Sequence, residues 1–182
     1  PLQIKAAFAA VREACAERRR AVPVLLSVTI EAPGTMLVGM DLGAALAALL
    51  PLGPVSFGLN CATGPETMKR HLGRLAAVGP QHLSAMPNAG LPRREGGRFV
   101  YSLGPADFAE WVAGFVRDEG VGIVGGCCGT RAEHLRALVE RVGGLAAPRR
   151  RPSPRPAMAA SLYGATSLRQ EPAPLMVGER LN

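Results

Sequence analysis

Aromatic residues and long apolar runs are both scarce in this sequence of 182 residues. Phe, Trp and Tyr together make up 4% of it, and it carries no recognisable nucleic-acid-binding motif. Proteins that bind single strands interleave basic residues with aromatic ones, so the formal charge of +7 does not by itself predict a nucleic-acid partner. No apolar stretch approaches the roughly 18 uninterrupted residues of a membrane-spanning helix. We therefore expect a soluble protein with neither a nucleic-acid partner nor a membrane span.

The basic residues gather near the C-terminal end of the chain. Residues 145–182 contain six Arg and two Glu, which gives this part +4 of the total charge of +7. The whole chain is 48% hydrophobic, which is enough for one domain with a core. Because the first residue is Pro and no signal-peptide pattern follows it, we expect the chain to start inside a longer protein.

Cysteine is used sparingly, with four residues in the chain. Without a secretion signal, these thiols favour a reducing compartment, and we expect a cytoplasmic protein. Cys127 and Cys128 are neighbours in the sequence, and neighbouring cysteines rarely bridge each other. The cysteines are therefore candidates for metal ligands, nucleophiles or core residues.

Hydrophobic spacing predicts alternating helices and strands. Apolar residues three or four apart predict an amphipathic helix over residues 4–19, and the run 24–30 predicts a strand buried on both faces. A helix over about 41–50 completes this first unit. Three further strand and helix pairs follow: 55–60 with 64–78, 82–86 with 105–118, and 121–125 with 131–142.

Four βα units of this length imply parallel strands joined by helical crossovers. Both a doubly wound sheet and a (β/α)8 barrel fit this α/β pattern, and we favour the C-terminal half of a barrel over residues 1–144. The Pro/Arg-rich composition of residues 145–174 predicts an interdomain linker. Residues 175–182 resemble the start of another domain.

In a barrel, catalytic groups gather at the carboxyl ends of the strands. Two of these ends share one pattern, in which cysteine precedes Thr and then a Glu three residues after that Thr. Such a Thr and Glu pair predicts a helix capping box. The residues of the two patterns are Cys61, Thr63 and Glu66, and then Cys127, Cys128, Thr130 and Glu133.

Barrel closure would bring Cys61, Cys127 and Cys128 together, and three thiolates suit a catalytic zinc site with one open position. A lone cysteine is more often a small buried apolar residue, and this is our interpretation of Cys15. Two adjacent thiols flanked by glycines are poor core residues, which favours metal binding. The three histidines are weaker candidates, because they lie within helices or at the wrong end of a strand.

Four polar residues at the strand ends are candidates for substrate contacts. Asn88 lies in the loop 86–92, which is equally well explained as a Pro/Gly turn. Thr29 and Glu31 end the first expected strand, and Asn60 ends the second.

Three segments carry a family resemblance. Residues 58–65 (GLNCATGP), 86–92 (MPNAGLP) and 125–130 (GGCCGT) resemble the homocysteine-binding barrel of the cobalamin-dependent methionine synthases. The last segment and the upstream cysteine are shared by the wider zinc-dependent homocysteine methyltransferases, and the resemblance covers about residues 1–142. It implies that Cys61, Cys127 and Cys128 bind Zn²⁺, with the sulfur of homocysteine in the fourth position.

The resemblance also implies a reaction and partners. Homocysteine would be methylated to methionine by methylcobalamin, which is recharged from methyltetrahydrofolate on cobalamin- and folate-binding domains of the parent protein. Residues 177–182 (VGERLN) resemble the first strand of the pterin-binding domain. Two alternatives remain: a methyltransferase that uses betaine or S-methylmethionine, and an inactive half-barrel that only binds zinc. We expect the isolated fragment to have little methyltransferase activity unless the upstream half of the barrel is supplied.

Overall fold

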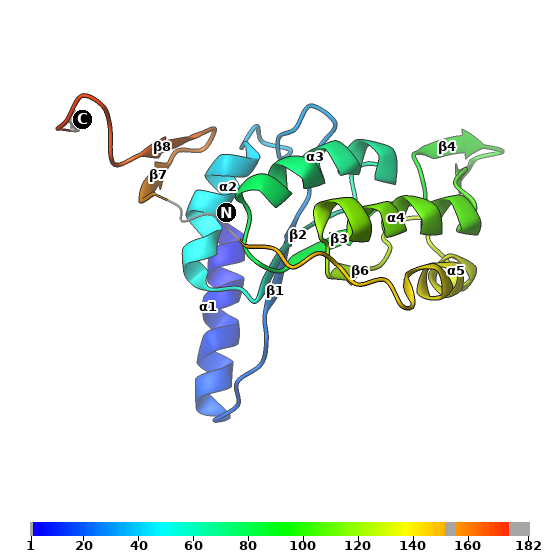
Figure 1. Ribbon diagram of the computed structural model, residues 1–182, viewed down its shortest axis with the longest axis horizontal. Helices are drawn as coiled ribbons and strands as arrows, with labels where there is room; N and C mark the ends of the chain where they lie inside the picture. Colours follow the sequence, from blue (N-terminus) through cyan, green and yellow to red (C-terminus); the bar gives the residue numbers. More distant parts are fainter. Residues whose placement is uncertain (1, 152–155, 175–182) are drawn as a thin grey trace.

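The computed structural model describes residues 2–151 and 156–174. It shows a mixed α/β fold whose four-stranded sheet is entirely parallel, with the strand order β1-β2-β3-β6 (Figure 1). The strands are β1 (Leu25–Val28), β2 (Ser56–Asn60), β3 (Leu83–Met86) and β6 (Ile123–Val124). All four expected strands are present in the expected sequential order.

The helices alternate with these strands. They are α1 (Leu2–Glu17), α2 (Leu42–Leu49), which continues into the short 3-10 helix η1 (Leu50–Leu52), α3 (Pro65–Val78), α4 (Pro105–Glu119) and α5 (Ala132–Val142). None of the described helices is both long and apolar enough to span a membrane.

The helices pack against one face of the sheet. Alternate residues of the strands, including Leu26, Phe57 and Leu83, are buried in one core together with residues from all five helices. The other face is buried in its middle, at Ser56 and Ser84, but exposed at its margins, where Leu25 is 51% exposed and Met86 is 36% exposed. The expectation that the first strand is buried on both faces is therefore wrong: β1 is an edge strand, and its exposure alternates along the chain.

A hairpin that the sequence analysis did not anticipate lies between β3 and α4. It consists of β4 (Pro92–Glu95) and β5 (Arg98–Tyr101), which pair antiparallel. The turn residues Gly96 and Gly97 have φ angles of 54° and 80°, which is the conformation that a two-residue hairpin turn requires and glycine adopts readily.

A second hairpin lies within the segment expected to be a linker. It is formed by β7 (Met158–Ala160) and β8 (Ala165–Ser167), and it packs on α2, where the backbone N–H of Asp41 donates to the carbonyl oxygen of Tyr163 at 3.0 Å. Arg150 donates to the carbonyl oxygens of Ala76 and Pro80 near the end of α3. This segment therefore contacts the α/β unit at two places, whereas the expected strand at 175–182 lies outside the described residues.

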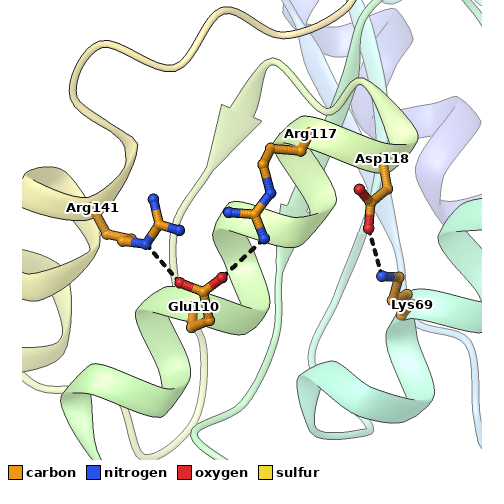
Figure 2. Close-up of polar contacts among 5 residues, drawn as sticks. All are labelled: Lys69, Glu110, Arg117, Asp118 and Arg141. Atoms are coloured by element: carbon orange, nitrogen blue, oxygen red, sulfur yellow. Dashed lines mark hydrogen bonds and ion pairs between the residues drawn. The ribbon is translucent and has the colours of Figure 1, made fainter.

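Ion pairs join the outer helices (Figure 2). Glu110 of α4 accepts from Arg117 at 2.9 Å on its own helix and from Arg141 of α5 at 2.6 Å. Lys69 of α3 lies 2.6 Å from Asp118 of α4. These pairs are solvent-exposed, so each contributes little to stability, but together they connect three helices.

Candidate metal centre

The three thiols that the sequence singled out meet at the carboxyl edge of the parallel sheet. Cys61 directly follows β2, while Cys127 and Cys128 follow β6. The Sγ atom of Cys128 lies 3.5 Å from that of Cys61 and 4.0 Å from that of Cys127. All three Sγ atoms lie within 4.8 Å of one another, and no other such group of His, Cys, Asp or Glu occurs among the described residues.

The backbone at the first cysteine is strained. Cys61 and Ala62 have φ angles of 59° and 55°, in the left-handed region that residues with a side chain rarely adopt. Each such residue costs about 1–2 kcal/mol. The N–H of Cys61 donates to the carbonyl oxygen of Met86 at 3.0 Å, which helps to hold this turn against the neighbouring strand. Strain of this kind concentrates at functional sites, where the surrounding structure maintains it.

The loop after β3 connects the two cysteine loops. Cys127 donates its N–H to the carbonyl oxygen of Pro87 at 2.9 Å, and Ala89 donates to that of Cys128 at 2.9 Å. The side-chain oxygen of Asn88 accepts from the N–H of Cys128 at 3.1 Å, and Asn88 is 4% exposed. Asn88 thus holds the backbone of a cysteine loop, while its expected contact with substrate stays a prediction.

The other candidate substrate residues lie along the same edge of the sheet. The side-chain oxygen of Asn60 accepts a 2.7 Å hydrogen bond from the hydroxyl of Ser27. Thr29 and Glu31 are half-buried just after β1. Among the described residues, neither of these two side chains forms a hydrogen bond with a cysteine loop, so the structure does not bring them into the thiol cluster.

The two expected capping boxes do not form. Helix α3 begins after Gly64 with Pro65 in its first turn, and the N-cap of α5 is Arg131, so each helix starts one residue later than expected. The hydroxyl of Thr130 instead donates to the carbonyl oxygen of Cys127 at 2.6 Å. Thr130 therefore stabilises the cysteine loop rather than the helix.

A histidine side chain, and not the expected Glu133, accepts a hydrogen bond from a backbone N–H at the N-terminus of α5. The N–H of Arg131 donates to Nδ1 of His134 at 3.2 Å, and Nε2 of His134 lies 3.0 Å from the carbonyl oxygen of Leu103. Both ring nitrogens are thus used in the fold, in agreement with the low expectation for His134 as a metal ligand.

Two of the three thiols, Cys61 and Cys127, have pKa values shifted in opposite directions. Burial raises the pKa of Cys127 to about 11, and its hydrogen bond with Cys61 adds to this effect. Burial also acts to raise the pKa of Cys61, but hydrogen bonds from Cys127, Cys128, the Ala62 backbone and Asn88 outweigh it and lower that pKa. Cys61 therefore carries negative charge more readily than Cys127, and a bound cation would favour the thiolate form of each ligand.

Tyr101 belongs to this site but was missed by the sequence analysis, whereas Gly129 lies in the segment 125–130 that the sequence singled out. A Cβ atom at Gly129 would overlap the ring of Tyr101, so the ring lies directly on the backbone of the cysteine loop. Burial raises the pKa of Tyr101, and the nearby Cys128 raises it further. The Gly-Gly pair at 96–97 was the available signal, because it predicts a hairpin that returns the chain at Tyr101.

Known proteins match the sequence of this chain, including the segments that carry the three cysteines. The family described as Homocysteine S-methyltransferase matches residues 2–142. The methionine synthase of Mycobacterium leprae (strain TN) is 45% identical over 186 residues, and that of Mycobacterium tuberculosis (strain ATCC 25618 / H37Rv) is 44% identical over 181 residues. Each alignment covers 100% of this chain and 15% of the relative, so the chain spans a small part of these longer proteins. The chain belongs to the homocysteine S-methyltransferase family.

Proposed function

We propose that this chain is the C-terminal half of a (β/α)8 barrel that activates the thiol of homocysteine for methyl transfer. The observation that carries this proposal is the convergence of the three Sγ atoms within 4.8 Å at the carboxyl edge of the sheet. Right-handed βα units place functional residues at this edge in a barrel. The family match and the two methionine synthases support the same reaction.

The three thiols fit a zinc ion in number, chemistry and spacing. Tetrahedral coordination with Zn–S bonds of about 2.3 Å separates neighbouring sulfurs by about 3.8 Å. Cys128 lies 3.5 Å from Cys61 and 4.0 Å from Cys127, on either side of this value, and all three sulfurs lie within 4.8 Å of one another. Three protein ligands leave one position for the substrate, as in catalytic zinc sites. We therefore assign Cys61, Cys127 and Cys128 as the ligands.

The chemistry follows from charge. Zinc bound by these residues would supply the positive charge that deprotonates the homocysteine thiol and holds its sulfur as the fourth ligand. Three cysteine thiolates would outweigh one divalent ion, so the site would be net negative before substrate binds. This excess charge would keep the substrate sulfur electron-rich, which favours formation of a bond from that sulfur to the methyl carbon while the bond from the methyl carbon to its donor breaks and the donor keeps the electron pair. Asn88 and Thr130 hydrogen-bond to the backbone of the cysteine loop and so hold Cys127 and Cys128 in position to bind the metal.

The methyl donor in this proposal is methylcobalamin, delivered by cobalamin- and folate-binding domains of the parent protein. The support is that the relatives carry the name methionine synthase and are several times longer than this chain. A zinc-binding fragment without catalysis is the second candidate, favoured by the partly uncovered face of the sheet around Leu25 and Met86. Free thiols at the site need a reducing compartment, so we place the protein in the cytoplasm.

The first experiment is elemental analysis of zinc combined with X-ray absorption at the metal edge, before and after addition of homocysteine. We expect one zinc per chain with three sulfur neighbours, rising to four when homocysteine binds. Zinc whose sulfur count does not change on addition of homocysteine would contradict substrate activation and leave the zinc-binding function. Absence of zinc under reducing conditions would contradict both.

A further inference from the structure

The β4–β5 hairpin (residues 92–101) is joined at its base to the thiol cluster. The ring of Tyr101 lies on Gly129, directly after Cys128. The N–H of Leu103 donates to the carbonyl oxygen of Ala89 at 3.2 Å, and Ala89 in turn donates to Cys128. From this base the hairpin projects away from the sheet at one end of the structure (Figure 1). A large molecule that approaches the thiols from this side therefore meets the hairpin.

One face of the hairpin carries an arginine and an aromatic residue opposite each other. Antiparallel register places Pro92 opposite Tyr101 and Arg94 opposite Phe99. Because side chains alternate along a strand, Arg94 and Phe99 share the face of Tyr101, the residue that lies on the cysteine loop. Phe99 is 73% exposed, which is unusual for so large an apolar side chain.

The arginines of the hairpin differ in their surroundings. Arg98 stands directly opposite Glu95, and Arg93 lines a shallow cavity of about 310 Å³ together with Glu66. None of these three arginines forms an ion pair within residues 2–151 and 156–174, and Arg94 alone among them has an aromatic residue opposite it. Its positive charge is therefore available to a partner beside an exposed aromatic side chain.

We infer that Arg94 and Phe99 form a docking surface for an acidic, partly apolar protein surface that brings the methyl group to the thiols. This inference rests on the proposed function. Arginine and aromatic residues are enriched in the centres of protein interfaces. A projecting hairpin suits a protein partner, whereas small ligands bind in concave sites. The charge of Arg94 speeds the approach of an acidic partner, and Phe99 supplies apolar area once contact is made.

The test compares two methyl sources in the full-length protein that contains this chain. One source is methylcobalamin bound to the protein's own cobalamin domain, followed as methionine formed in a single turnover. The other is methyl iodide, a small reagent that reaches the homocysteine thiolate without docking. The variants are Arg94→Glu and Phe99→Ser. The matched control is Arg18→Glu, an exposed arginine just after α1, in another part of the fold.

We expect both hairpin variants to slow transfer from the bound carrier by about tenfold or more, the size of effect seen at interface hot spots. Methionine formation from methyl iodide and the zinc content should stay within about twofold of the wild type, as in the control. Added salt should slow carrier transfer more in the wild type than in Arg94→Glu, because salt screens the attraction.

Other outcomes overturn the inference. Carrier transfer equal to the control would mean that the hairpin is not the docking surface. Loss of both reactions with zinc retained would mean that the hairpin acts on homocysteine instead. A changed molecular mass in light scattering without a change in transfer would identify it as a self-association surface. If wild-type protein with bound zinc formed no methionine even from methyl iodide, the proposed function itself would fail.

Discussion

Cys128 lies between the other two thiols of the cluster, 3.5 Å from Cys61 and 4.0 Å from Cys127. We expect Cys128→Ala to weaken zinc binding by more than the roughly 10–100-fold that loss of an outer partner of a metal ligand costs, because a direct ligand is removed. Cys15, half-buried on α1, is the matched control, and Cys15→Ala should leave zinc affinity intact. Affinity is measured by competition with a chelator. Equal losses in both variants would refute the ligand assignment.

Gly129 is a second residue that can be tested, because its backbone strain can be separated from its contact with the Tyr101 ring. Its φ angle is 80°, and a side chain there would also overlap the Tyr101 ring. Gly53 has a similar φ of 76° but nothing within 4 Å of its Cβ position. Gly53→Ala therefore measures backbone strain alone, about 1–2 kcal/mol. We expect Gly129→Ala to lower the free energy of unfolding by a further ~1–3 kcal/mol from overpacking.

The two glycine variants should also differ in metal affinity. Gly129→Ala displaces the cysteine loop or the Tyr101 ring, so zinc should bind more weakly than to wild type. Gly53→Ala should bind zinc normally, since Gly53 lies at the opposite ends of the strands, between η1 and β2. Urea unfolding and chelator competition measure the two effects. Identical behaviour of the variants would show that the Tyr101 contact with Gly129 does not support the site.

At the scale of elements, the ion pairs between α4 and its neighbours predict a pH dependence. Hydrogen bonds from Arg141 and then Arg117 lower the pKa of Glu110. A lowered carboxyl pKa stabilises the native state above the unfolded value of about 4.3, and this stability is lost as the pH falls through the folded pKa. We expect Glu110→Gln to be less stable than wild type at neutral pH and to converge with it in acid.

Urea midpoints measured from pH 7 to about pH 3 test this expectation across the range in which carboxylates titrate. Glu140→Gln on α5 is the control, because Glu140 is exposed and forms no ion pair in the part of the chain that the structure describes. A difference between Glu110→Gln and wild type that stays constant with pH would mean that the carboxylate charge is not involved.

The local sequence was sufficient to predict the helices and strands, but not how the helices are capped. The five helices and four parallel strands were all expected, because their apolar periodicity is set by the residues themselves. Cap positions were not, since α3 begins at Pro65 and α5 is capped through His134 rather than through Thr and Glu. In the structure the N–H of Thr130 donates to the carbonyl oxygen of Cys127, and the N–H of Arg131 donates to His134, so the folded cysteine loop determines where α5 begins.

At the scale of the whole molecule, the parallel sheet that the structure describes is open. β1 and β6 are its edge strands, and Leu25 of β1 is 51% exposed. Under the proposed function, we expect residues 1–182 alone to form little methionine from homocysteine and methylcobalamin, and the remaining half of the barrel to restore activity when added. Methionine formation is measured with equal zinc in both samples. Full turnover by residues 1–182 alone would contradict the half-barrel assignment.

The sequence alone determined the alternating order of helices and strands and the meeting of Cys61 with Cys127 and Cys128. Apolar spacing defines the elements, and right-handed parallel connections put the ends of the strands on one edge. Only the tertiary structure decided the exposure of β1, the contact of Tyr101 with Gly129, and the packing of Arg150 and the β7–β8 hairpin on the α/β unit. Each of these depends on contacts between segments far apart in the chain, which no local pattern specifies.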